Sequence, residues 1–419
     1  MGDGLSPLVG VLILVLLGLL GSRLAFDPDR APLGPRLLLA TGSHFLLVGL
    51  LLGPVLGLLT LEVIGQLESL FALGLGWIGL LFGLQLDRTQ LSQFPTAFLL
   101  FTVIQAAVAF VVFAGLGVAA FHLAGALRPG IDVAIFATAA TAAVSTPAGV
   151  ALISRTFRVQ GPLTRLIFYV ASLDALVGIL ALQVTYAVYH PSTAIIEGMG
   201  WGLWLGIALA TGIIFGVIFL WLTRPKPERD ELTLFLLGLA VFEAGTALYL
   251  GISPLFVCML TGVVIANLSP SRKRVYSILQ AWEKPIYVVV LILAGALLGA
   301  GSWIALPLAL GYALLRGVGK LGGGVAARRL APLGLQAPAA VGLGLVPQGG
   351  ISLAMALSAA LTYGAIVGPE GTPIRTAFAT IVVAVAASEL VGPFLIRGLL
   401  RRAGEITPVD EAVLAEDAR

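Results

Sequence analysis

The stretch IDVAIFATAATAAVSTPAGVALISRTF, residues 131–157, is apolar and long enough to cross a membrane, but proline and glycine interrupt it. Three hydroxyl side chains precede the interruption at helical spacing and therefore share one face: Thr138, Thr141 and Ser145. Pro147 follows, and proline removes a backbone donor and disfavours helix in the residue before it. We therefore predict that this helix breaks near Ser145–Gly149.

A second apolar stretch carries a similar interruption near its middle. It reads PAAVGLGLVPQGGISLAMALSAAL, residues 338–361, and is interrupted by Pro347, Gln348, Gly349 and Gly350. Paired interrupted helices in two inverted halves indicate the binding site of a secondary transporter, because freed carbonyls coordinate cations and helix ends carry partial charges. The alternative is a pair of ordinary proline kinks, since proline and glycine are common in membrane helices.

The composition indicates a helical membrane protein. Of 419 residues, 59% are hydrophobic and 11% are charged, and the mean hydropathy is +1.05. We predict an all-α polytopic fold with about thirteen transmembrane helices, inverted repeats and two crossed broken helices. The predicted spans are residues 7–25, 36–52, 67–86, 97–124, 131–156, 163–190, 199–222, 231–250, 252–268, 283–301, 303–328, 338–361 and 373–400.

The basic residues support this number of spans. Arg316 and Lys320 remain inside a span, and all other basic residues except Arg128 and Arg375 fall on one side of the membrane. Cytoplasmic loops of membrane proteins carry the excess of lysine and arginine. This bias predicts that the N-terminus lies outside and the C-terminus in the cytoplasm.

Few ionisable residues lie deep within the predicted spans, and Asp174 is one of them. It stands roughly 16 Å into the sixth span, where a charge costs at least about 2.5–3.5 kcal/mol. We predict Lys320 as its partner, because the small residues of RGVGKLGGGVAA allow close helix approach; Arg316 lies one turn away. Such a pair exchanges protons during transport, or else it is a static ion pair joining two helices.

Other features of the sequence exclude several classes of protein. Glu243 and Glu389 also lie within spans, and we favour a structural role for both as protonated, hydrogen-bonding acids. The sequence contains no phosphate-binding glycine motif, HExxH motif or Cys/His cluster, so we expect neither an enzyme nor a cofactor. The net charge of +3 is spread over loops and does not suggest nucleic acid binding, and the lone Cys258 excludes an internal disulfide.

Seven short motifs follow one another along most of the chain: GLLLGPVLGLL (49–59), GLGWIGLLFGLQLD (74–87), STPAG (145–149), SLDALVG (172–178), GISPLFVCMLTGVVIAN (251–267), GKLGGG (319–324) and GLVPQGG (344–350). In this order they resemble the monovalent cation:proton antiporter superfamily, the sodium/proton exchanger fold. The resemblance implies a homodimer with elevator-type motion and places Lys320 where many members carry a basic residue facing the ion site. It also implies a division into dimerisation-domain helices 1–3 (1–96), core helices 4–6 (97–190), linker helix 7 (191–230), dimerisation-domain helices 8–10 (231–301), core helices 11–13 (302–402) and a cytoplasmic tail (403–419).

The ion site departs from the family pattern. Family members usually carry Asp-Asp or Asn-Asp in the sixth span, and the second Asp binds the ion and the proton. Here Asp174 takes the first position and Ala175 the second or, in a register shifted by one, Leu173 the first and Asp174 the second. The twelfth span often carries Pro-Arg-Gly-Glu, where this chain has Pro347, Gln348, Gly349 and Gly350.

We predict a multi-pass transporter of the cell (inner) membrane that exchanges a monovalent cation, Na⁺ or K⁺, for protons. The predicted ion- and proton-binding residues are Asp174, Lys320, Ser145, Thr146 and Gln348, supported by Thr141, Pro147, Pro347, Gly349, Gly350, Arg316 and Glu243. No metal is expected beyond a transported Na⁺ at Asp174. Two alternatives stay open: the same fold carrying an anion or small organic solute, bound by Lys320, Arg316 and half-helix N-termini, and a non-transporting membrane sensor or scaffold.

Overall fold

The computed structural model describes residues 7–23, 31–128, 130–190, 199–224, 227–298, 304–335, 337–364 and 372–406, and these ranges contain helices but no strands. The predicted all-α class is confirmed. The helices are α1 (Pro7–Arg23), α2 (Leu33–Thr41), α3 (Phe45–Leu50), the π-helical turn η2 (Leu51–Val55), α4 (Leu61–Gln66), α5 (Glu68–Gln85), α6 (Arg88–Leu91), α7 (Thr96–Leu123), α8 (Ile131–Ala142), α9 (Pro147–Thr156), α10 (Pro162–Val188), α11 (Trp201–Leu222), α12 (Arg229–Tyr249), α13 (Pro254–Leu268), α14 (Arg272–Ala296), α15 (Ala305–Leu330), the 3₁₀ helix η3 (Val341–Leu345), α16 (Gly350–Gly364) and α17 (Thr372–Arg402).

Helix length and composition agree with a membrane location. Among the described residues, eight helical segments are long and apolar enough to cross a bilayer, with α8 and α9 counted as one, and the bent pair α2 and α3–η2 makes a ninth. Three shorter apolar helices run over Leu12–Gly21, Pro254–Leu268 and Gly350–Tyr363. Each of the predicted spans contains a helix, while their number of thirteen and their orientation stay predictions.

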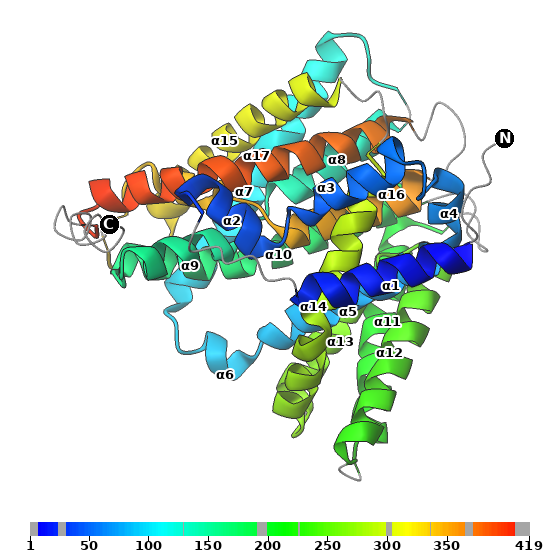
Figure 1. Cartoon of the computed structure of the whole chain (residues 1–419). Helices are drawn as coiled ribbons and strands as arrows, with labels where there is room; N and C mark the ends of the chain where they lie inside the picture. Colours follow the sequence, from blue (N-terminus) through cyan, green and yellow to red (C-terminus); the bar gives the residue numbers. More distant parts are fainter. Residues whose placement is uncertain are drawn as a thin grey trace.

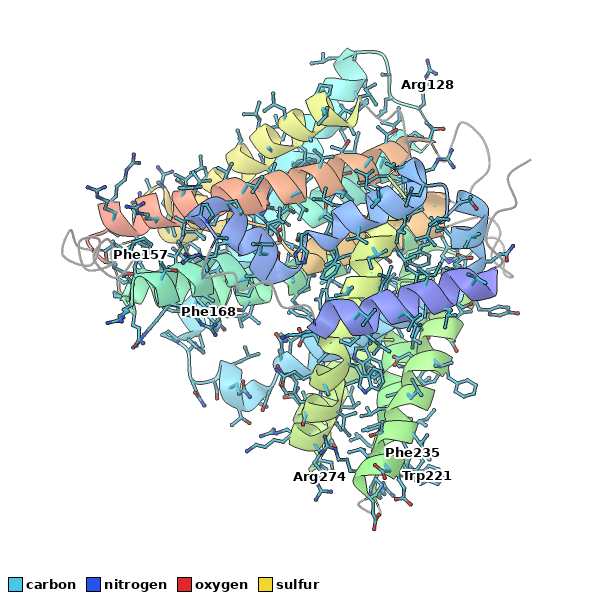
Figure 2. The ribbon with its side chains drawn as sticks, in the orientation of Figure 1. Arg128, Phe157, Phe168, Trp221, Phe235 and Arg274 are labelled. Carbon is cyan, nitrogen blue, oxygen red and sulfur yellow. The ribbon has the colours of Figure 1, made fainter. Side chains whose placement is uncertain are left out.

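The helices pack in two groups (Figure 1). In the first group, α15 packs against α7 and α17, and α10 packs against α7, α8 and α9. In the second group, α13 packs against α5, α11 and α12, and α14 packs against α1, α3 and α5. Figure 2 shows Trp221, Phe235 and Arg274 near the lower ends of α11, α12 and α14. The candidate site is built mainly from the first group, and α2 contacts that group through α17.

The second predicted span, 36–52, is wrong as a single helix. Its first part, α2, ends at Thr41, and the following segment, which begins at Phe45, is inclined to it by 69°. Gly42 lies between them with φ of +81°, a conformation that glycine adopts without steric cost. The nearest proline in the following segment is Pro54, within η2, so proline does not mark this bend in the sequence.

The tenth predicted span, 283–301, begins too late. The helix α14 starts at Arg272, and its first turns bury Val275, Ile278 and Leu279 on one face. Apolar residues at this spacing, separated by charged and polar ones, form an amphipathic helix. The basic run that opens α14 is therefore a helical turn and not a loop.

Glycines set the close packing of α5 on α13. A Cβ added to Gly79 would collide with the carbonyl of Leu255, and one added to Gly83 would collide with the carbonyl of Met259. Small residues let two membrane helices bring their backbones together. Both glycines of α5 are therefore required by the approach of α13.

We expect Gly79→Ala to destabilise the protein by about 1–3 kcal/mol, because the added methyl group is forced against a backbone carbonyl. Thermal unfolding of the detergent-solubilised protein measures this effect. Gly245→Ala in α12 is the matched control, since a Cβ there meets open space. A Gly79→Ala protein that melts at the wild-type temperature would contradict the packing argument.

Candidate functional site

The fifth span is broken between α8 and α9. The second half, α9, begins at Pro147, so residues 143–146 form the break. The predicted break, 145–149, is too far along the chain. Proline is tolerated in the first turn of a helix, where its missing N–H has no partner to lose, so Pro147 begins α9 and is not part of the break. The Thr146 side chain caps this turn, and its Oγ accepts the N–H of Ala148 at 3.3 Å.

The twelfth span is broken between η3 and α16, and the two breaks cross. Residues 346–349 connect the two half-helices without helical structure of their own. The N–H of Thr146 donates to the carbonyl of Pro347 at 3.0 Å. The Thr146 side chain also packs on Gly349, where an added Cβ would lie 2.9 Å from the Thr146 Oγ. The predicted pair of crossed broken helices is therefore confirmed.

Asp174 faces this crossing from the middle of α10 and is completely buried. Its Oδ1 accepts the N–H of Ser145 at 2.9 Å, and its Oδ2 lies 2.7 Å from the Ser145 Oγ. The Nζ of Lys320 donates to the same Oδ2 at 2.9 Å. The predicted contact between Asp174 and Lys320 is confirmed as an ion pair with both side chains fully buried.

Two basic side chains of α15 hold the C-terminal ends of the half-helices. Arg316 donates to the carbonyl of Ala142 at the end of α8, and to the carbonyl of Leu345 at the end of η3 at 3.0 Å. Lys320 donates to the next carbonyl of the fifth span, that of Ala143, at 2.5 Å. Helix C-termini carry partial negative charge, so both cations stand where the helix dipoles stabilise them.

Gln348 connects the same elements on another side of the crossing. Its Nε2 donates to the carbonyl of Thr141 at 2.9 Å and to the hydroxyl of Tyr312 at 2.8 Å. Tyr312 is a site residue that the sequence analysis did not single out. Its spacing could have identified it, because Tyr312 lies four residues before Arg316 and therefore on the same face of α15 as both basic residues. The hydrogen bonds of Gln348 therefore tie α8, α15 and the second break together and do not reach Asp174.

Two other acids, Glu243 and Glu389, are also buried. The Glu243 Oε1 of α12 lies 2.5 Å from the hydroxyl of Thr261 in α13, which is also 2.7 Å from the carbonyl of Gly212 in α11. Glu243 thus joins helices of the second group, and the structure does not bring it to the crossing. Glu389 is completely buried in α17.

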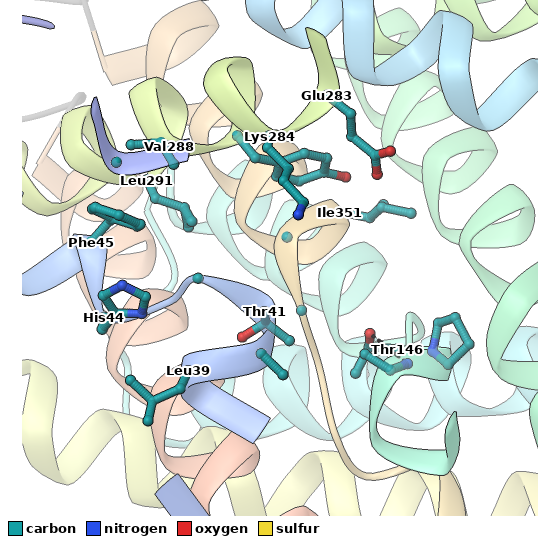
Figure 3. A pocket seen from close by; sticks show the side chains of 18 of the residues that line it. Leu39, Thr41, His44, Phe45, Thr146, Glu283, Lys284, Val288, Leu291 and Ile351 are labelled. Carbon is teal, nitrogen blue, oxygen red and sulfur yellow. Dashed lines mark hydrogen bonds between the residues drawn. The ribbon is translucent and has the colours of Figure 1, made fainter. Parts of the chain in front are cut away.

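A cavity of ≈ 560 Å³ lies beside the crossing (Figure 3). Figure 3 shows Lys284 reaching from α14 toward the part of the cavity where Thr41 and Thr146 lie. Ser145 lines the cavity as well, so the wall next to the buried Asp174 is formed by the residue that hydrogen-bonds it. The lining also includes the bend of the second span (39–42, 44 and 45), Gln85, and the first residues of α9 and α16.

The sequence profile of the family described as sodium/hydrogen exchanger, transmembrane, matches residues 30–402. The chain belongs to the sodium/hydrogen exchanger family. It is therefore a multi-span membrane protein and a transporter, not an enzyme, as expected. No curated protein sequence matches the chain significantly.

Solved structures of a sodium/hydrogen exchanger share this fold. The sodium proton antiporter MjNhaP1 from Methanocaldococcus jannaschii at pH 8 superposes with a TM-score of 0.67 at 16% identity, over 94% of this chain and 98% of that chain. A second structure of the same antiporter, from electron microscopy, gives a TM-score of 0.64 at 17% identity, over 96% and 100% of the two chains. At these identities the likeness shows the fold alone.

Gly350 and Ala175, two of the positions at which the sequence departs from the family pattern, are closely packed. An added Cβ at Gly350 would collide with the ring of Tyr287 in α14, so the structure leaves no room for an acid there. Ala175 is 1% exposed within the apolar core. Asp174 is the only acid of α10, so it is the residue of this helix that supplies a carboxylate to the crossing.

Proposed function

We propose that this chain exchanges a monovalent cation, Na⁺ or K⁺, for protons across the cell (inner) membrane. The observation that carries the proposal is the buried carboxylate of Asp174, held at the crossing of two broken helices and paired with Lys320. The family assignment supports cation/proton antiport, and the structurally similar MjNhaP1 is a sodium proton antiporter. Asp174 and Lys320 are the residues to which we assign the exchange.

In this proposal one carboxylate serves two ligands in turn. A cation that reaches Asp174 takes the place of the Lys320 ammonium, since either positive charge stabilises the ionised carboxylate. A proton on Asp174 removes the negative charge that both the cation and the Lys320 ammonium need. The acid therefore alternates between Lys320, the cation and a proton, and it never carries a cation and a proton together.

The geometry of Ser145 is compatible with both protonation states of the acid. Its hydroxyl has one proton and two acceptors within reach, Asp174 Oδ2 at 2.7 Å and the Leu345 carbonyl at 2.8 Å. When Asp174 is ionised, the hydroxyl donates to the carboxylate. When Asp174 is protonated, the Ser145 Oγ accepts from it and donates to Leu345, so the Ser145 hydroxyl keeps a donor or acceptor partner in both states.

For the movement that exposes this site alternately to the two sides, we infer an elevator. The first group of helices, which carries Asp174 and both breaks, would move relative to α5 and α11–α14, in a homodimer. The cavity supports this inference because it reaches Ser145 from one side. An anion carrier has less support, since the two cations it needs, Arg316 and Lys320, already donate to backbone carbonyls and to Asp174. Membership of a transporter family argues against a sensor or scaffold.

Proteoliposomes with an imposed pH gradient test the proposal. We expect Na⁺ or K⁺, but not choline, to drive proton movement, and the cation concentration for half-maximal flux to rise as the pH falls. The sign follows from competition, because protons occupy the carboxylate that the cation needs. Folded protein that moves no protons with any monovalent cation would refute antiport. Flux driven by an organic anion would favour the alternative cargo.

A further inference from the structure

A second buried polar cluster lies further along α10 and joins the two groups of helices. The Tyr186 hydroxyl donates to the Ser358 Oγ at 2.9 Å, and this oxygen lies 3.4 Å from the Ser253 Oγ. The N–H of Ser253 donates to the Gln183 Oε1 at 3.2 Å. None of the four residues is more than 1% exposed. Ser253 caps α13 of the second group. Gln183 and Tyr186 belong to α10 of the first group, and Ser358 belongs to α16, which packs mainly on α17 and α8 of the first group.

The cluster is displaced from the cavity along two helices. The helix α16 begins in the cavity wall at Gly350, and Ser358 lies eight residues further, roughly 12 Å along the axis. Gln183 follows Asp174 by nine residues of α10, roughly 13 Å. The cluster therefore lies further from the cavity than Ser145 and Asp174 do.

The ends of α13 show that the displacement is toward the opposite side. Ser253 stands at the N-terminal end of this helix. Gln85, which lines the cavity, belongs to the C-terminal end, because Asn267 near that end of α13 donates to the carbonyl of the adjacent Leu86 at 3.1 Å. The cavity and the polar cluster thus lie at opposite ends of α13.

The cluster is closed in this structure and incompletely hydrogen-bonded. Among the described residues, the Gln183 Nε2 has no hydrogen-bond partner, although it is buried. Toward the end of α16, the ring of Tyr363 packs on that of Tyr186, with centroids 5.4 Å apart and planes at 72°. Polar side chains within membrane helices face the interior or an ion pathway, and a buried amide without a partner costs free energy. Packing alone therefore does not account for Gln183.

We propose that Gln183, Tyr186, Ser253 and Ser358 form the gate on the side opposite the cavity, and that their oxygens line the route of the monovalent cation when the gate opens. This rests on the proposed antiport. A site open on one side must close on the other, and here the closure is made by hydrogen bonds between the two groups of helices. Neutral oxygen ligands of this kind replace the hydration shell of a monovalent cation.

A reversible cross-link across the gate tests this proposal. The 3.4 Å between the two serine oxygens puts Ser253→Cys and Ser358→Cys within reach of a disulfide. The pair is introduced together with Cys258→Ala, which removes the native thiol. After oxidation with copper–phenanthroline we expect proton-coupled cation flux to fall at least about tenfold, and to return on reduction, because the gate can no longer open. Thiol counting after denaturation reports whether the disulfide has formed.

The controls separate a failed gate from a failed antiporter. Gly76→Cys with the native Cys258 bridges α5 and α13 within the second group, where the two Cβ atoms would be 3.8 Å apart, and this bridge should leave flux unchanged. Equal flux in the oxidised and reduced gate variant would overturn the gate. Absence of flux in the reduced variant and in the wild type would overturn the antiport itself.

A second variant covers the case in which the disulfide does not form. With Cys258→Ala, a cysteine introduced by Gln183→Cys is buried in the closed gate. We expect a membrane-impermeant maleimide, added on the side opposite the cavity, to label it during turnover and much more slowly without the cation. Labelling that is equally slow in both conditions, in protein that transports, would refute the opening of this gate.

Discussion

Replacing Asp174 by asparagine is expected to reduce cation-dependent proton flux by about 100-fold or more, because an amide neither binds a proton at working pH nor neutralises a cation. The substitution keeps the shape of the side chain and an acceptor for the N–H of Ser145. Flux is measured in proteoliposomes under the same pH gradient as for the wild type. Glu243→Gln is the matched control, since it replaces a completely buried acid away from the crossing by an amide of the same shape and should leave flux unchanged.

The same substitution leaves the ammonium of Lys320 buried without its counter-charge, which costs about 3–5 kcal/mol. The double variant Asp174→Asn/Lys320→Met is therefore expected to regain stability without regaining flux. Wild-type flux in either variant would contradict the role assigned to Asp174. An equal loss in Glu243→Gln would show that any buried acid of this protein has the same effect.

Replacing Arg316 by alanine is expected to destabilise the protein strongly. The guanidinium satisfies the carbonyls at the ends of both half-helices, those of Ala142 and Leu345, in a buried site. Each carbonyl left without a donor costs about 1–3 kcal/mol, so we expect a total loss of about 3–5 kcal/mol. Thermal unfolding in detergent, followed by size-exclusion chromatography, measures the change.

Two further variants refine this prediction. Arg316→Lys keeps the charge but loses the planar fork that reaches both half-helices, so an intermediate loss of stability is expected. Arg274→Ala removes an exposed arginine at the start of α14 and should be neutral. An Arg316→Ala protein as stable as Arg274→Ala would mean that the two helix ends do not depend on this side chain.

The two breaks and the Asp174–Lys320 pair could be predicted because each violates a local rule of membrane helices. Proline and glycine interrupt otherwise apolar spans, and a charge near the midplane requires a partner. The bend at Gly42 could not be predicted in this way, since a single glycine is compatible with a continuous helix. The early start of α14 was obscured because its first turns are too polar to read as part of a span.

The contacts of uncharged polar residues could not be predicted from the sequence for a different reason. Tyr312, Gln183 and Ser358 are unremarkable within their own helices, and their partners come from distant parts of the chain. Periodicity identifies which face of a helix is polar, but it does not identify the residue opposite. The hydrogen bonds of Gln348 and the polar cluster beyond Asp174 therefore required the structure.

The hydrogen bonds across the crossing also constrain the order in which the protein is assembled. The N–H of Thr146 is bonded by Pro347, and the carbonyl of Ala142 by Arg316, which follows it by 174 residues. Because the N-terminal half of a chain is synthesised first, the break in the fifth span enters the bilayer before either partner exists. An unsatisfied backbone group in hydrocarbon costs several kcal/mol. The first half of this protein therefore reaches its final structure only after the second half has been inserted beside it.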